Sequence, residues 1–310
     1  MRVAILGAGG VGSYYGGLLA RAGHHVVLLA RGPNLAALRA RGLEVRTPDG
    51  AFTAPVDATD DMETIGKTDL AIVAVKTYSL EEITPAVRRL AEGGAAVVPL
   101  LNGVEAVDRL VAGGVPSAMV LGGLTQISAV RTAPGVVERR SAFQRVTVGE
   151  TTGGVSERAE RIAAMFRAAG VDAQVSPDIT ADLWRKLAFI ASMAAACGLA
   201  RSPVGPVLGS PLGRLLVERA VREVFAVARA LGVMLAENEE SKVVSFIDSL
   251  PGGLKPSFLL DLESGGPTEL DDLCGAISRL GRRARVETPV HDTATAALAV
   301  AVHAGPAGTR

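Results

Sequence analysis

The first thirty residues constrain the fold of this chain more than any other segment. Val3-Ala-Ile-Leu6 is a short run of residues that favour a β-strand, and Gly7-Ala-Gly-Gly-Val-Gly12 follows it directly. A helical pattern then extends to Ala22, Gly23 is placed to end the helix, and a second apolar run reaches Ala30. A strand, a G-x-G-x-x-G turn and a helix in this order are typical of a βαβ unit that binds a dinucleotide.

In such a unit, the glycines of the turn have separate structural roles. Gly7 permits the tight bend, Gly9 lets the backbone approach a pyrophosphate, and Gly12 lets the helix pack closely on the strand. Gly10 and Val11 begin the helix whose N-terminus faces the anion. We therefore predict that Gly7, Gly9, Gly10, Val11 and Gly12 bind a dinucleotide cofactor, the alternative being that the glycines only form a turn.

The residue after the second predicted strand indicates which dinucleotide is bound. An acidic side chain there would accept hydrogen bonds from the adenosine ribose of NAD, but the chain has Arg31. A guanidinium can bind a 2′-phosphate, and Lys76, after the third predicted strand, would add a second positive charge near the cofactor. We therefore expect NADP(H). A solvated surface arginine and a plain loop lysine are the alternatives for these two positions.

The first half of the chain alternates strand and helix patterns, which predicts an α/β fold with a doubly wound, mostly parallel sheet. Strands are predicted at residues 3–6, 25–30, 70–75, 95–100 and 118–122. Residues 135–137 and 146–148 are expected to close the sheet as antiparallel strands, and residues 171–175 to add a last strand.

Beyond about Pro177 the strand pattern ends, which places a domain boundary between residues 1–177 and 178–310 and predicts an all-helical second domain. Its helices are predicted at residues 180–199, 210–231, 237–249, 267–283 and 289–302. The tail from Gly305 is expected to fray.

Composition excludes several classes of function. Lys plus Arg and Asp plus Glu number 32 each, so no basic field would attract nucleic acid. Cys197 and Cys274 lie far apart without metal-ligand spacing, which predicts neither a disulfide nor a metal site. The most apolar stretch, residues 187–200, follows two cations and predicts a buried helix rather than a membrane span. Because no signal sequence precedes the first strand, we expect a soluble, cytoplasmic protein.

Two further segments offer side chains for chemistry on a substrate. The fourth predicted strand ends in Asn102-Gly103, at the ligand-binding edge of a doubly wound sheet, the alternative for Asn102 being a plain turn residue. Lys186 begins an apolar helix, where partial desolvation would lower its pKa toward that of a proton donor near neutral pH. Ser257 and Glu269 lie in a polar segment where capping residues are equally expected. By spacing alone, Lys186 is as compatible with a helix surface as with a catalytic site.

In this order the motifs resemble those of the ketopantoate reductases, the NADPH-dependent 2-dehydropantoate 2-reductases, over nearly the whole chain. The shared segments are the glycine turn, Val75-Lys76, Leu101-Asn102-Gly103, Trp184-Arg-Lys186-Leu, and Ser257 followed by Asp261 and Thr268-Glu269. The resemblance implies an NADP-binding Rossmann domain, here residues 1–177, and a helical substrate and catalytic domain, here residues 178–310, with the active site between them. It allows a monomer or a homodimer.

The resemblance also implies a role for each matching residue. Lys186 corresponds to the general acid for the reduced carbonyl, and Glu269 to a glutamate that assists catalysis and contacts the substrate. Asn102 and Ser257 correspond to substrate-binding residues, and Asn102 also to a cofactor contact. Arg31 and Lys76 correspond to the residues that favour NADPH.

The chain departs from this pattern on the predicted catalytic helix. Family members usually carry asparagines four and eight residues after the catalytic lysine, where this chain has Ile190 and Ala194. Apolar groups at both positions remove hydrogen bonds to a polar substrate, so we expect ketopantoate or a less polar 2-oxo acid. An apolar ketone or imine is an alternative substrate. A further alternative is a catalytically impaired protein that binds NADP(H) as a sensor or interaction module.

Overall fold

The computed structural model describes residues 1–303, and these residues form two compact units. Unit 1 comprises residues 1–101 and 106–179, while unit 2 comprises residues 102–105 and the chain from Thr180 onwards. Each unit has its own hydrophobic core. The short segment 102–105 is the one departure from a simple division of the chain into two halves. The tail from Gly305 lies outside the described residues.

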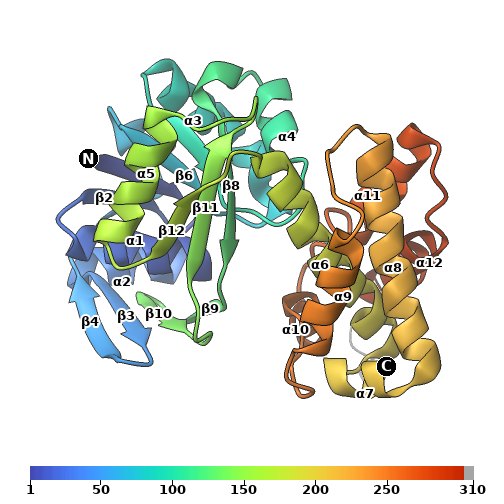
Figure 1. Cartoon of the computed structure of the whole chain (residues 1–310). Coiled ribbons are helices and arrows are strands. Elements are labelled where there is room, and N and C mark those ends of the chain that lie inside the picture. The colour runs from blue at the N-terminus through green and yellow to red at the C-terminus, as the bar shows by residue number, and fades with distance from the viewer. Residues whose placement is uncertain (304–310) are drawn as a thin grey trace. The chain divides into compact units, whose positions relative to one another are not determined.

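A five-stranded parallel sheet forms the centre of unit 1, with the strand order β5-β2-β1-β6-β7. Figure 1 labels β2 and β6 of this sheet. The strands are β1 (Arg2–Leu6), β2 (His25–Leu29), β5 (Asp57–Thr59), β6 (Leu70–Val73) and β7 (Ala96–Pro99). β2 and β6 pair with β1 on its two sides, so the chain runs outward from β1 in both directions. This is the predicted doubly wound sheet, and it gathers the carboxyl ends of β1, β2 and β6 at one edge.

Alternating residues of β1 explain how helices cover both faces of this sheet. Val3 and Ile5 belong to one buried cluster together with residues of α1 (Gly10–Arg21) and α2 (Gly32–Arg41). Ala4 and Leu6 belong to another buried cluster together with residues of α3 (Leu80–Glu92). Since successive strand residues point to opposite faces, a strand buried on both faces needs the nearly continuous apolar run that the sequence shows here.

The remaining strands of unit 1 differ from the prediction. β8 (Leu121–Gln126), β11 (Arg145–Glu150) and β12 (Asp172–Val175) form a three-stranded sheet, and a bridge between Val97 and Val120 links it to β7. The strand predicted at residues 118–122 begins later, at Leu121, because a 3₁₀ turn at Ser117–Met119 follows Pro116. α5 (Glu157–Ala168) lies along this sheet and packs on β11 and β12.

The prediction that residues 135–137 close the central sheet was wrong. β10 (Val136–Arg139) lies in a separate four-stranded sheet of order β4-β3-β10-β9, with β3 (Leu43–Thr47), β4 (Gly50–Ala54) and β9 (Ala129–Ala133). β10 pairs in parallel with β3, which lies far earlier in the chain. The β3–β4 hairpin was not predicted, because its apolar residues alternate with polar or exposed ones and form no continuous apolar run.

Helices are the regular elements of unit 2 among its described residues, and no strand occurs there, as expected. Its helices are α6 (Ile179–Ala200), α7 (Val204–Gly209), α8 (Pro211–Ala230), α9 (Glu239–Asp248), α10 (Ser257–Ser264), α11 (Cys274–Ala284) and α12 (Pro289–His303). α8 begins as predicted, because the Ser210 hydroxyl accepts a hydrogen bond from the Gly213 amide and Pro211 occupies the first turn.

The predicted helix at residues 267–283 was wrong over its first seven positions. The amides of Asp272 and Leu273 donate to the carbonyl of Glu269, and the amide of Gly275 donates to the carbonyl of Leu270. These bonds form an irregular turn, and regular helix starts only at Cys274. The backbone around Glu269 is therefore held in a turn rather than in a helix.

α6 is the one helix among residues 1–303 that is long and apolar enough to cross a membrane. In the structure, however, 61% of its most apolar window is buried. Its small side chains pack with α8 and α11 residues in the core of unit 2. Burial of this kind is what the core helix of a folded domain requires.

The core of unit 1 can be tested at Phe166 on α5. Its side chain is fully buried, and its ring meets the ring of Tyr15 edge to face at 5.6 Å between centroids. Phe166→Ala is expected to lower the free energy of unfolding by about 3–5 kcal/mol in urea denaturation, because it leaves a cavity. Phe143→Ala, at a ring that is 61% exposed, should change it by at most about 0.5 kcal/mol. Equal losses in the two variants would contradict this packing.

Candidate active site

The glycine turn after β1 is built by backbone approaches that leave no space for side chains. Gly7 has a φ of +118°, and an added Cβ there would lie 2.7 Å from the backbone of Ala74. A Cβ at Gly12 would lie 2.0 Å from the carbonyl oxygen of Gly7. At Gly10 it would lie 2.0 Å from the carbonyl oxygen of Ala129 on β9. Gly7, Gly10 and Gly12 are therefore required by packing within unit 1.

Gly9 differs from its neighbours because the space beside it is open. No atom lies within 4 Å of the position that its Cβ would occupy. Gly9 caps α1, and the first turn of this helix has neither a side-chain cap nor an acidic residue. The positive end of the helix dipole and the amides of Gly10 and Val11 are thus available for an anion beside Gly9. This geometry fits the pyrophosphate of a dinucleotide.

The two cations predicted near the cofactor lie on either side of this turn. Arg31 caps α2 directly beyond β2, and its side chain is 58% exposed. Lys76 follows β6, is exposed, and precedes a 3₁₀ turn at Thr77–Ser79. Because β2 and β6 flank β1, both residues belong to the edge of the sheet that carries the glycine turn.

Sequence reasoning missed a carboxylate at this edge. Glu82, in the first turn of α3, accepts a hydrogen bond of 2.6 Å from the Arg31 guanidinium. The two residues lie 51 positions apart, and acidic residues at the start of a helix are ordinary dipole-complementing residues. The sequence therefore carried no signal that would single out Glu82.

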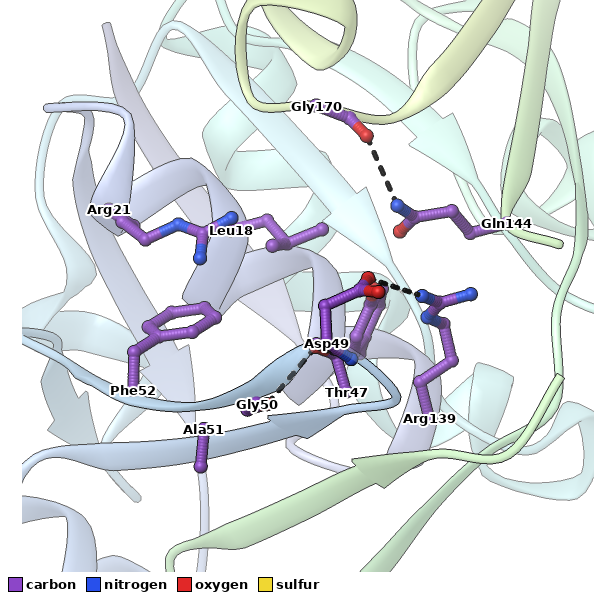
Figure 2. A pocket seen from close by; sticks show the side chains of 11 residues that line it. Leu18, Arg21, Thr47, Asp49, Gly50, Ala51, Phe52, Arg139, Gln144 and Gly170 are labelled. Carbon is purple, nitrogen blue, oxygen red and sulfur yellow. Dashed lines mark hydrogen bonds and ion pairs between the residues drawn. The ribbon is translucent and has the colours of Figure 1, made fainter. Parts of the chain in front are cut away.

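A cavity of about 290 Å³ lies along the later turns of α1 and the β3–β4 hairpin (Figure 2). Tyr14, Arg21, Phe52, Arg139 and Gln144 are among the residues that line it, and the Arg21 guanidinium lies 3.9 Å from the centroid of the Phe52 ring. Burial raises the pKa of the Tyr14 hydroxyl. None of the predicted site residues lines this cavity.

In unit 2, the structure brings together three residues that the sequence had separated widely. The Lys186 ammonium on α6 donates to the Asn102 side-chain oxygen at 3.1 Å. The Asn102 side-chain nitrogen donates to a Glu269 carboxylate oxygen at 3.0 Å. An ammonium only donates and a carboxylate only accepts, so the two charged partners set the orientation of the amide between them. The three side chains form a hydrogen-bonded relay, Lys186–Asn102–Glu269.

Burial and the nearby carboxylate together set the pKa of Lys186. Burial lowers the pKa of Lys186 to about 8, and the Glu269 carboxylate partly opposes that shift. Glu269 itself is 5% exposed. A lysine with such a pKa exchanges its proton close to neutral pH, as an acid–base group in catalysis must.

Ser257, Ile190 and Ala194, which the sequence pattern also singled out in unit 2, differ in their burial. Ser257 begins α10 and is exposed, and among the described residues it makes no hydrogen bond to the relay. Ile190, one turn beyond Lys186, is partly buried, and Ala194, two turns beyond, is fully buried. The buried Ser192 hydroxyl has no hydrogen-bond partner within the described chain. The face of α6 beyond Lys186 is therefore apolar.

Comparison with known proteins identifies relatives along nearly the whole chain. A family model described as "Ketopantoate reductase PanE/ApbA" matches residues 3–153, and its companion "Ketopantoate reductase PanE/ApbA C terminal" matches residues 178–301. The 2-dehydropantoate 2-reductase of Halobacterium salinarum is 34% identical over 295 residues, which cover 94% of this chain and 95% of the relative.

Solved structures agree in fold with this chain. The crystal structure of 2-dehydropantoate 2-reductase from Geobacter metallireducens GS-15 has a TM-score of 0.89 at 32% identity, covering 97% of this chain and 100% of that one. The ternary structure of D-mandelate dehydrogenase with NADH and anilino(oxo)acetate has a TM-score of 0.87 at 25% identity, covering 98% of each chain. The α/β fold followed by a helical unit is thus common to these proteins.

The contrast between Gly9 and Gly12 yields a test of the turn. Gly9→Ala should leave the unfolding midpoint nearly unchanged but weaken binding of a nicotinamide dinucleotide by about tenfold or more, because the methyl group enters the open space beside the helix N-terminus. Gly12→Ala should cost about 1–3 kcal/mol of stability, because its methyl group meets the Gly7 carbonyl. Fluorescence titration and urea denaturation measure the two effects. Wild-type affinity in Gly9→Ala would refute the assignment.

Proposed function

The chain belongs to the ketopantoate reductase family, and on that premise we propose that it reduces the carbonyl group of a small 2-oxo acid with NADPH. It is an oxidoreductase acting on CH–OH groups, and its cofactor is a nicotinamide dinucleotide. The observation that carries the proposal is the Lys186–Asn102–Glu269 relay. In it, the Asn102 amide links a lysine with a lowered pKa to a buried carboxylate by two hydrogen bonds.

The glycine turn fits the cofactor. The open space beside Gly9 and the uncapped start of α1 suit its pyrophosphate, and Arg31 and Lys76 suit the 2′-phosphate of NADPH. Bound there, the cofactor supplies a hydride. The protein's own part in the reaction is to orient the 2-oxo acid and to deliver a proton.

Lys186 is the proton donor in this proposal. The Lys186 ammonium would transfer a proton to the carbonyl oxygen as negative charge develops on that oxygen during reduction, which would give a 2-hydroxy acid. The Asn102 side-chain oxygen holds the ammonium in position. Glu269 favours the protonated form, so the lysine retains its proton at neutral pH despite burial. Asn102, Ser257 and Glu269 are proposed to contact the substrate.

The side chain of the substrate is proposed to be less polar than that of ketopantoate. Ile190 and Ala194 present no hydrogen-bonding groups on the α6 face that continues from Lys186. A site without polar partners discriminates against a hydroxyl-bearing substrate. The similarity to D-mandelate dehydrogenase supports this substrate class, since mandelate is a 2-hydroxy acid with a phenyl side chain.

The role of Lys186 predicts a specific pH dependence. Because the ammonium must be protonated to act as the acid, kcat/KM for reduction should be constant below pH 8 and fall about tenfold per pH unit above it. Oxidation of the 2-hydroxy acid needs the neutral amine, so its rate should rise through the same range. Lys186→Ala should lower kcat by about 10²–10⁴ with NADPH affinity retained.

The matched control for this test is Lys242→Ala, at an exposed lysine on α9 of the same unit, which should retain full activity. Undiminished turnover in Lys186→Ala would overturn the catalytic assignment. NADPH binding without turnover of any 2-oxo acid would favour a sensor instead.

The apolar face of α6 predicts a substrate preference. Wild-type protein should reduce phenylglyoxylate, an aromatic 2-oxo acid, with a higher kcat/KM than ketopantoate. Ile190→Asn should shift the ratio about tenfold toward ketopantoate, because the amide restores a hydrogen-bonding group one turn from Lys186. Ile190→Leu is the control, and its ratio should stay within about threefold of the wild-type ratio. An unchanged ratio in Ile190→Asn would contradict the role of this position.

A further inference from the structure

The Arg31–Glu82 ion pair joins the N-cap of α2 to the first turn of α3, the helices that follow the two strands flanking β1. Arg31 comes after β2 and Glu82 comes after β6, and β1 with its glycine turn lies between these strands. The two side chains meet with 2.6 Å between a guanidinium nitrogen and a carboxylate oxygen. Both are more than half exposed, at 58% and 54%. A ligand bound at this edge of the sheet therefore reaches both groups.

The Arg31 guanidinium and the Glu82 carboxylate favour different substituents at the 2′-position of the adenosine ribose. A guanidinium attracts a 2′-phosphate, whereas a carboxylate repels that phosphate and accepts hydrogen bonds from the free 2′-hydroxyl of NADH. In the pair, the Glu82 carboxylate also occupies part of the Arg31 fork and neutralises its charge. A 2′-phosphate must therefore compete with Glu82 for Arg31.

We infer that Glu82 sets the cofactor preference by restraining Arg31, so that the protein accepts NADH as well as NADPH and prefers NADPH only modestly. This inference rests on the proposed placement of Arg31 beside the adenosine ribose. Glu82 is a specificity-determining residue in this view, and it takes no part in hydride or proton transfer.

The exposure of the pair limits the size of the effect. Exposed ion pairs contribute little in water, and a favourable phosphate contact readily replaces one. Removing the Glu82 charge is therefore expected to strengthen binding of a 2′-phosphate about fivefold. The gain should shrink at about 1 M salt, where screening acts within a few ångströms.

The test separates the ribose phosphate from the rest of the reaction. Isothermal titration of the full chain with 2′,5′-ADP and with 5′-AMP measures the discrimination for the 2′-phosphate without turnover. Glu82→Gln keeps the shape of the side chain and removes its charge. Glu81→Gln is the matched control, because Glu81 lies in the same helical turn but pairs with Arg109 at 3.6 Å. Arg31→Ala tests the proposed cofactor site itself.

Glu82→Gln is expected to raise the affinity for 2′,5′-ADP about fivefold without raising the affinity for 5′-AMP, while Glu81→Gln changes neither by more than about twofold. The ratio of kcat/KM for NADPH over NADH should rise by the same factor in Glu82→Gln. Equal gains in both glutamine variants, or none in Glu82→Gln while Arg31→Ala loses discrimination, would overturn the inference alone. Unchanged discrimination in Arg31→Ala would overturn the proposed cofactor site as well.

Discussion

The close approach of α1 to the end of β1 is the constraint on which the rest of unit 1 depends. With 2.0 Å between a hypothetical Gly12 Cβ and the Gly7 carbonyl oxygen, any side chain at Gly12 would push the helix off the strand. The approach holds the uncapped start of α1 at the edge where β1, β2 and β6 end. Because the segments after these strands begin at the same edge, Arg31, Lys76 and Glu82 belong to the edge of the sheet that carries the glycine turn.

In unit 2, the corresponding constraint is the burial of charge. Lys186 lies on a helix whose following turns are almost entirely small and apolar, and desolvation there disfavours its charged form. The charge of the Glu269 carboxylate opposes this shift only in part, and the Asn102 amide bridges the two side chains by hydrogen bonds. A partly buried lysine with a lowered pKa beside a buried carboxylate is an arrangement typical of functional sites.

The proposed cofactor preference and the proposed substrate preference depend on opposite kinds of surface. At the sheet edge, Arg31 and Glu82 form an ion pair, and we propose that their charges affect which ribose is favoured. On α6, Ile190 and Ala194 offer no polar groups, and we propose that this limits which side chains a substrate can carry. The first preference is electrostatic and sensitive to salt. The second depends on desolvation and is expected to change little with salt.

The sequence by itself determined the local features: the glycine turn, the parallel strands buried on both faces, the helical second half, and Lys186, Asn102 and Glu269 as candidate residues. These follow from short-range periodicity and from motifs in a recognisable order. Only the tertiary structure decided that Asn102 lies between Lys186 and Glu269, that β10 pairs with β3, and that Glu82 neutralises Arg31. Each of these contacts joins residues distant in the chain, so packing, rather than local propensity, brings them together.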